Sequence, residues 1–310
     1  MAVFAGLKAC KNRRPFILSS GKGVKIYPMK ILIAADMEGI PGVVNWDQVD
    51  PGHAEYSRFR RIMTESVNAA IRGAVEAGAT EVIVSDGHGQ ALNILIEELD
   101  PRVRLYSGSP SPLAMVQGAD SGVDGAMFVG YHARAGTQNA ILDHTWSSKS
   151  VANVWLNGLI VGEIGLNAAI LGHFHVPVLM VSGDQAVCSE AVDLLGQIEV
   201  APVKRATGRM SAECLPLPDA MQSICEAASR AITRLRATGT DDKSSGKAFG
   251  LFRLPEPIQV AIEFNTSEMA DKASLFPGLK RLDGRRIELE AGDMLAAYRA
   301  FHAVVTLARA

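Results

Sequence analysis

From residue 29 onward, short apolar runs alternate with longer stretches in which apolar residues recur at helical spacing. One such stretch, residues 57–78, keeps its apolar side chains on one helical face and ends at Gly78. The apolar runs lack the regular polar alternation of a strand with one face in solvent. They are KILIAAD (30–36), TEVIVSD (80–86), GAMFVGYH (125–132) and VPVLMVSGD (176–184). The pattern predicts an α/β fold, with a mostly parallel sheet covered by helices on both faces.

Shorter elements are expected between these runs. Residues 93–99 and 165–174 favour helices, and Asn157-Gly158 favours a hairpin-like turn before a helix start. Asp184 ends a strand and precedes a helical pattern. We therefore expect Asp184 to cap that helix rather than to line a pocket.

The character of the chain changes near residue 205. The part that follows contains two helical patterns and one alternating pattern typical of a half-exposed antiparallel strand, at 219–237, 293–308 and 258–264. The polar stretch 238–247 is typical of an exposed loop. We expect an α/β catalytic domain over residues 29–205 and a smaller α+β domain over residues 206–310.

The first 28 residues contain six basic residues and no acidic residue. They lack the continuous apolar segment of a secretory signal, although their acid-poor composition with Arg and Ser also fits a transit segment. We expect a basic, disordered extension ahead of a domain that starts at Met29. Because the whole chain holds 31 Lys and Arg against 33 Asp and Glu, the remainder has a net charge of −8.

Composition argues against several kinds of partner and location. The formal net charge is −2 and the sequence pI is about 6.4, so neither nucleic acid nor an anionic membrane is expected as a partner. Polar residues interrupt the most apolar region, 151–182, which is not expected to span a membrane. The four cysteines form no C-x-x-C pair, which indicates reduced, mostly buried thiols and a cytoplasmic protein.

Acids and histidines follow three of the predicted strands. Asp36 and Glu38 stand two residues apart at the end of the first run, so their side chains point to the same side. His88 follows the second run, and His132 ends the third. Ligand sites of open parallel sheets lie outside the carboxyl ends of the strands, which would bring these four side chains together.

Two carboxylates and two imidazoles are the ligand chemistry of a divalent transition metal, with zinc favoured over manganese, cobalt or iron. A carboxylate such as Asp36 can bridge two ions in a two-metal hydrolytic site. Taken singly, Asp36 and Glu38 are also typical of a strand that ends in solvent, and His88 is typical of a turn. Their recurrence at equivalent positions of three strands favours the metal site.

Five motifs in a fixed order resemble those of the D-aminopeptidase family of zinc metallopeptidases, peptidase family M55. They are ADMEGIPGVVNW, SDGHG, VGYHA, LDHTWS and LNGLIVGEIGLNAAI. The stretch 260–301 also resembles the usual ending of that family. The resemblance covers residues 29–310 and leaves residues 1–28 without a counterpart.

The resemblance implies two zinc ions per chain and a bridging carboxylate, Asp36. The implied ligands are Asp36, Glu38, His88, His132 and Glu163, with Glu38 and His88 on one ion and His132 and Glu163 on the other. It also implies that His144 is an active-site residue, which could shuttle a proton. From the residue pattern alone, Glu163 would be structural, beside a helix dipole, and His144 fits a hydrogen-bonded loop histidine equally well.

The function implied is that of a zinc-dependent aminopeptidase. Such a hydrolase would use a metal-activated water to act on short peptides with an N-terminal D-amino acid, of the D-Ala type. The resemblance also implies a homo-oligomer, a ring-type decamer. Two alternatives remain open: a metal-dependent hydrolase of another amide or phosphoester bond, and a non-catalytic peptide-binding protein.

Overall fold

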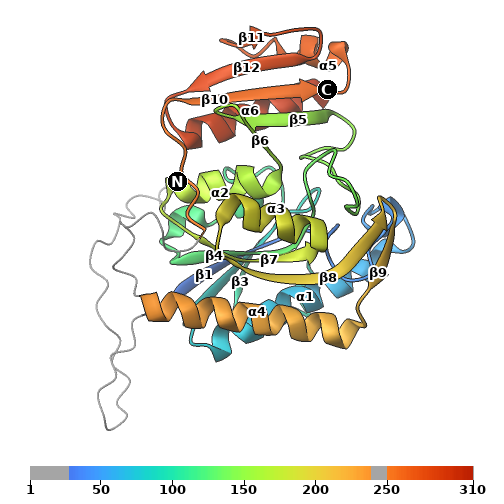
Figure 1. Cartoon of the computed structure of the whole chain (residues 1–310), viewed down its shortest axis with the longest axis vertical. Helices are drawn as coiled ribbons and strands as arrows, with labels where there is room; N and C mark the ends of the chain where they lie inside the picture. The colour runs from blue at the N-terminus through green and yellow to red at the C-terminus, as the bar shows by residue number, and fades with distance from the viewer. Residues whose placement is uncertain (1–27, 239–249, 310) are drawn as a thin grey trace, which may run out of the picture.

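The computed structural model describes residues 28–238 and 250–309. Its largest feature is a seven-stranded sheet in the order β3-β2-β1-β4-β7-β8-β9 (Figure 1). The strands are β1 (Lys30–Ala35), β2 (Glu81–Asp86), β3 (Arg104–Tyr106), β4 (Gly125–Tyr131), β7 (Val178–Asp184), β8 (Glu199–Gly208) and β9 (Ser211–Cys214). Neighbouring strands are parallel except for β8 and β9, which are antiparallel. The expected mostly parallel sheet is confirmed.

Helices cover both faces of this sheet, as expected. α1 (Tyr56–Glu76) and α4 (Leu217–Thr238) pack side by side on one face. α2 (Glu163–His173) and α3 (Gln185–Leu195) lie on the other face (Figure 1). The helices predicted over residues 57–78, 165–174 and 219–237 correspond to α1, α2 and α4.

Each strand in the middle of the sheet contributes to two cores. In β1, Ile31 and Ile33 belong to the core under α1 and α4, whereas Leu32 and Ala34 belong to the core on the opposite face. A strand buried on both faces must be apolar at nearly every position, which explains its unbroken apolar run.

A second, smaller sheet has the order β11-β12-β10-β5-β6 and is antiparallel throughout. Its strands are β5 (Val151–Leu156), β6 (Leu159–Val161), β10 (Ile258–Phe264), β11 (Lys280–Arg281) and β12 (Arg286–Ala291). α6 (Met294–Arg309) packs against both this sheet and α2, and α5 (Ser267–Ala273) packs against α6 (Figure 1). The predicted antiparallel strand and closing helix are confirmed as β10 and α6.

Strand membership crosses the expected boundary at residue 205. β5 and β6 come from residues 151–161, yet β5 pairs with β10 in the smaller sheet. Conversely, α4 comes from the second half of the chain and packs on α1 under the large sheet. The expected extension over residues 1–28 lies outside the described residues, except for Pro28. The polar stretch beyond Thr238 also lies outside them.

The helix expected over residues 93–99 is wrong. This segment forms a single turn, in which the N–H groups of Glu98 and Leu99 donate to the Leu95 carbonyl. Its first amides are tied to the side chains of other elements, because Asn93 and Ile94 donate to the Asp86 carboxylate. These tethers, with a proline at position 101, leave too little chain for a helix.

The connections also include turns that the residue types require. Asn157 and Gly158 have φ angles of +47° and +80°, the left-handed conformation of a two-residue hairpin turn, so the expected turn between β5 and β6 is confirmed. Three short 3₁₀ helices are η1 (Trp46–Gln48), η2 (Ala114–Val116) and η3 (Ala119–Ser121).

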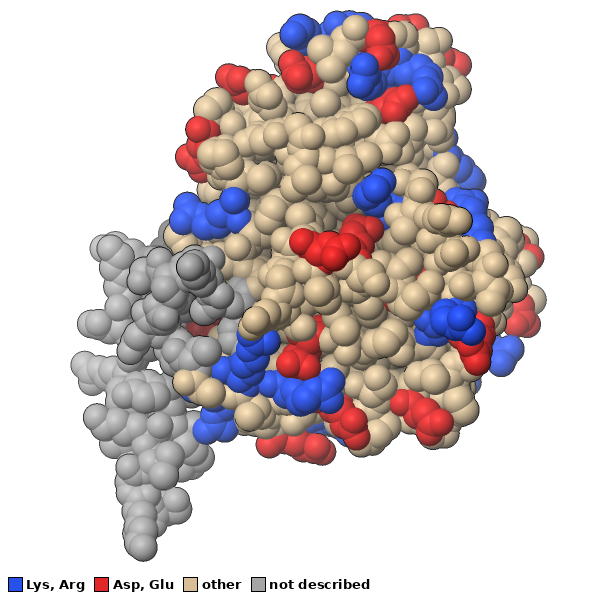
Figure 2. Space-filling view, in the orientation of Figure 1, with Lys and Arg blue, Asp and Glu red and all other residues tan. Residues whose placement is uncertain are grey.

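The surface and the cysteines bear on the expected partners and location. Basic and acidic residues are interspersed on the face shown in Figure 2, with wide uncharged areas between them. Among the described residues, no helix combines the length and apolarity needed to cross a bilayer. Cys188, Cys214 and Cys225 are free thiols, but only Cys188 is buried, so the expectation of mostly buried thiols is wrong for this part of the chain.

Asp184 caps α3, as expected. Its Oδ1 accepts a hydrogen bond from the Val187 N–H at 2.9 Å. Its Oδ2 accepts a second hydrogen bond from the Ile141 N–H at 2.6 Å. The buried Asp184 side chain therefore also ties α3 to the loop that leads to His144.

We expect Asp184→Ala to lower the free energy of unfolding by about 2–4 kcal/mol, because a helix cap is lost and two buried N–H groups lose their acceptor. Urea denaturation followed by circular dichroism measures the change. Asp219→Ala is the control, since Asp219 is an exposed acid in the first turn of α4, and it should cost less than about 0.5 kcal/mol. Similar small losses in both variants would contradict the anchoring role.

Candidate metal centre

The C-terminal ends of β1, β2 and β4 meet at one edge of the large sheet. Asp36 and Glu38 follow β1, His88 lies two residues after β2, and His132 follows β4 directly. The structure brings these four side chains together, as the strand-end pattern predicts. Glu163 and His144 join them from α2 and from the loop between β4 and β5.

Asp36, Glu38 and His88 form a first donor group, in which one possible ligand atom of each lies within 4.8 Å of the others. His88 Nδ1 is 3.0 Å from Glu38 Oε2 and 3.4 Å from Asp36 Oδ1. Asp36 and Glu38 are each only 2% exposed. The carboxylates are therefore shielded from water that would otherwise solvate their charge.

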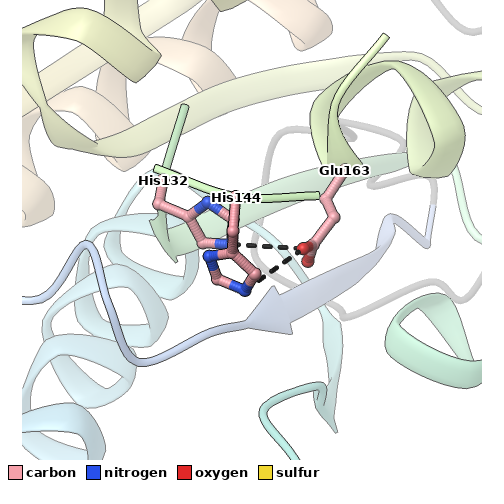
Figure 3. Close-up of side chains that lie close together, drawn as sticks. All are labelled: His132, His144 and Glu163. Carbon is pink, nitrogen blue, oxygen red and sulfur yellow. Dashed lines mark ion pairs between the residues drawn. The ribbon is translucent and has the colours of Figure 1, made fainter. Parts of the chain in front are cut away.

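His132, His144 and Glu163 form a second donor group (Figure 3). Glu163 Oε1 lies 3.2 Å from His132 Nε2 and 3.8 Å from His144 Nε2. The two imidazole rings stack with their centroids 3.9 Å apart. The Trp146 N–H donates to Glu163 Oε1 at 2.7 Å and so fixes this carboxylate, which belongs to the first residue of α2.

Asp36 joins the two groups through its two oxygen atoms. Oδ1 faces His88, whereas Oδ2 lies 3.5 Å from His132 Nε2. One oxygen for each group is the arrangement that a bridging carboxylate needs. Within the described part of the chain, Asp36 Oδ2 and His132 Nε2 are buried and make no hydrogen bond. A cation held by both atoms would satisfy them.

Each of the three histidines is oriented by a backbone carbonyl. The second ring nitrogen of His88, His132 and His144 lies 2.9, 3.0 and 2.9 Å from the carbonyl oxygens of Val49, Ala133 and Leu142, respectively. Because a carbonyl can only accept, that nitrogen carries the hydrogen. In a neutral ring, the other nitrogen then presents its lone pair to the carboxylates, which is how metal-binding histidines are held.

The pKa values in the site follow from this concentration of buried negative charge. Burial, together with the Glu38 and Glu163 carboxylates, raises the pKa of Asp36 to about 7. Burial alone would lower the pKa of His132, but the Glu163 and Asp36 carboxylates hold it well above its usual range. The side chains thus balance their charge by retaining protons, which divalent cations would replace.

His88 and Glu38 show the same coupling. Burial opposes ionisation of both groups, but each charge stabilises the other. The pKa of His88 is therefore raised well above its usual range, and the pKa of Glu38 is held well below its own. Imidazole and carboxylate donors with this spacing fit zinc, so the residues present suit the two ions implied by the sequence resemblance.

His144 differs from the other two histidines. Burial and the neighbouring His132 charge lower the pKa of His144 below its usual value. Its Nε2 lies 3.9 Å from Glu38 Oε1 and 3.8 Å from Glu163 Oε1, so it faces both donor groups. This position fits proton transfer and also ligation within the second group. Its catalytic role therefore stays a prediction.

Two parts of the site had no clear signal in the residue pattern. Glu163 carries the only carboxylate of the second donor group, although an acid in a first helical turn is common. Asp86, in the SDGHG motif, accepts hydrogen bonds from Asn93 and Ile94, and Asn93 Nδ2 donates to the His88 carbonyl at 2.7 Å. The signal in the sequence for this hydrogen-bonded anchor of the His88 loop was Asp86 itself, an acid at the end of a strand and two residues before His88.

A cavity of about 610 Å³ borders both donor groups, and Asp36, Glu38 and Glu163 are among the residues that line it. The basic residues among the described residues that line the cavity are Lys149 and Arg309. A volume of this size is typical of sites for small ligands.

A family model described as D-aminopeptidase, Peptidase M55, matches residues 29–303. The chain belongs to this D-aminopeptidase family, which confirms the resemblance seen in its motifs.

A sequence comparison and a structure comparison each match a D-aminopeptidase of Bacillus subtilis over nearly the whole chain. The D-aminopeptidase of Bacillus subtilis strain 168 is 37% identical over 281 residues, which cover 90% of this chain and 98% of the relative. A solved structure is described as the Zn-dependent D-aminopeptidase DppA from Bacillus subtilis, a self-compartmentalizing protease. It has a TM-score of 0.83 and 36% identity, and the match covers 91% of this chain and 98% of that one. The match in fold confirms the expected α/β class.

Purified protein should contain about two zinc ions per chain, one for each donor group, and Asp36→Ala should lose most of this metal. The reason is that Asp36 contributes to both groups. Inductively coupled plasma mass spectrometry measures the content. Asp50→Ala is the matched control, because Asp50 lines the same cavity but belongs to neither donor group. Full metal content in Asp36→Ala would refute the bridging assignment.

Proposed function

We propose that this protein is a zinc-dependent D-aminopeptidase that hydrolyses short peptides with an N-terminal D-residue. The observation that carries the proposal is the pair of donor groups that share Asp36 beside a cavity of about 610 Å³. Membership in the D-aminopeptidase family and the descriptions of the sequence and structure matches support the activity. Bound zinc would supply Lewis acidity at the scissile carbonyl and activate a water molecule.

The proposed ligands divide between two ions. Glu38 and His88 would hold one ion, and His132 and Glu163 would hold the other, with Asp36 shared between them. The support for this division is that each oxygen of Asp36 faces a different histidine.

In this proposal His144 takes a proton from the attacking water and passes it to the leaving amine. Its Nδ1–H donates to the Leu142 carbonyl, which leaves the Nε2 lone pair directed towards the Glu38 and Glu163 carboxylates. Burial and the neighbouring His132 lower the pKa of His144, which favours the neutral ring that can accept a proton at Nε2. The same nitrogen can then donate that proton to the leaving amine.

The cavity walls fit the two charged ends of a short peptide. Two basic residues from different segments line the wall. Lys149 is exposed, and Arg309 donates to the Trp146 carbonyl at 3.1 Å. These cations would attract the C-terminal carboxylate of a dipeptide, and the carboxylates of the site would favour its α-ammonium group. This complementarity favours short substrates with free termini.

The proposal includes an assembly and a location. One relative is described as self-compartmentalizing, which supports a homo-oligomer for this chain, and a ring-type decamer is the form expected from the family. The three described cysteines are free thiols, which fits a reducing compartment such as the cytoplasm.

With added zinc, the protein should hydrolyse D-Ala-D-Ala on the order of 100-fold faster than L-Ala-L-Ala, because the wrong enantiomer misplaces the scissile carbonyl. Amino-acid release followed by chromatography measures both rates. A panel of other amides and phosphoesters completes the test. Turnover of only those compounds would favour the alternative hydrolase, and peptide binding without any turnover would favour a binding protein.

His144→Ala should keep its zinc but lose activity on D-Ala-D-Ala by about 10²–10⁴-fold, because the proton-transfer group is removed. Metal analysis and steady-state rates are both measured. His53→Ala is the control, since His53 is an exposed histidine paired with Asp47, and it should leave both values unchanged. Loss of one zinc ion in His144→Ala would instead identify His144 as a ligand.

A further inference from the structure

Lys204 on β8 is a buried lysine whose ammonium group contacts the loop that follows β1. In the large sheet, β1 lies three strands away from β8. The residue is 3% exposed. Its Nζ lies 2.6 Å from the Glu38 carbonyl oxygen, 2.9 Å from that of Ile40 and 2.7 Å from that of Val43. An ammonium group has three hydrogens, so each carbonyl receives one.

The loop reaches Lys204 because it crosses the end of β4. The Gly39 N–H donates to the Gly130 carbonyl at 2.8 Å. A Cβ atom at Gly39 would lie 1.8 Å from the Tyr131 carbonyl oxygen, so a glycine is needed for this close crossing. The backbone of residues 38–43 is therefore held from one side by β4 and from the other by Lys204.

This loop supplies a ligand and an orienting carbonyl to the first donor group, and it meets the second group at His144, whose ring lies against Trp46. It carries Glu38, and it continues to Val49, whose carbonyl orients His88. The second group instead depends on the end of β4, the loop of His144 and the first turn of α2.

The three carbonyls match the protonated form of Lys204. Burial lowers the pKa of Lys204 to about 8, while the charges of Asp184 and Glu38 oppose the decrease. Asp184 is the register partner of Lys204 on the neighbouring strand β7. The three hydrogens of the Lys204 ammonium group match the three carbonyl oxygens in number, and hydrogen bonds from a charged donor are stronger than neutral ones.

We propose that Lys204 is a positioning residue for the first donor group. Its ammonium group fixes the backbone of residues 38–43 and thereby the Glu38 carboxylate and, through Val49, the His88 ring. This inference rests on the proposed metal centre, and it assigns to Lys204 a selective effect on one of the two ions.

The test measures zinc affinity by competition with a chelator in two backgrounds. In Glu163→Ala the first donor group stays complete, and in Glu38→Ala the second group keeps its three side chains. Lys204→Met keeps the aliphatic side chain but removes the three donors. We expect it to weaken zinc binding about 10–100-fold in the Glu163→Ala background and to change it little in the Glu38→Ala background.

Two further variants complete the experiment. Lys30→Met is the matched control. Lys30 begins β1, at the end of the strand away from the donor groups, and donates to the Ser121 carbonyl, so its replacement should change neither zinc affinity. Lys204→Gln retains a neutral donor; if Lys204→Met fails to fold, the same selective loss is expected from Lys204→Gln, but smaller.

An unchanged affinity in the first background, or equal losses in both, would overturn the role of Lys204. Wild-type protein that binds no zinc would overturn the metal centre itself, so the two failures are distinguishable.

Discussion

Three buried carboxylates that face the same histidines are the constraint on which the rest of this structure depends. Asp36, Glu38 and Glu163 are nearly inaccessible to water, and removing ionised groups from water is costly unless other charges compensate them. These carboxylates raise the pKa values of His88 and His132, so that positive charge on the imidazoles would compensate part of the negative charge. Divalent cations compensate it without protons, which is the physical reason for regarding the cluster as a metal centre.

The main chain supplies most of the contacts that hold the cluster in place. Backbone carbonyls orient the three histidines, and the Trp146 N–H holds Glu163. The strands behind these contacts are buried on both faces, so their ends are rigid points of attachment. The sheet edge and its loops thus hold together a donor set whose carboxylates repel one another.

The fold class and four of the six site residues could be predicted from the sequence because both depend on local patterns. Apolar runs without alternation indicate a sheet covered on both faces, and acids or histidines at the ends of those runs meet at its carboxyl edge. Glu163 could not be inferred in this way, because its place depends on how the β5–β6 hairpin pairs with β10 about 100 residues later. The family motifs supplied it instead.

The same reasoning explains the other differences. The segment 93–99 has a helical composition, but its amides are held by Asp86, which lies on a strand earlier in the chain. Strand pairing between β5 and β10 leaves no compositional trace near residue 205. Lys204 carried no signal in the sequence, and only the folded chain shows that the loop after β1 crosses the end of β4 to reach it.

The β5–β6 hairpin has a consequence for the whole molecule. Glu163 follows β6 of the smaller sheet after a single residue, whereas Asp36 follows β1 of the large sheet directly. Ions coordinated by both would act as a cross-link between the two sheets, and α6 closes the same cavity with Arg309. The C-terminal part of the chain thus forms one wall of the cavity, through His302, Thr306 and Arg309 of α6.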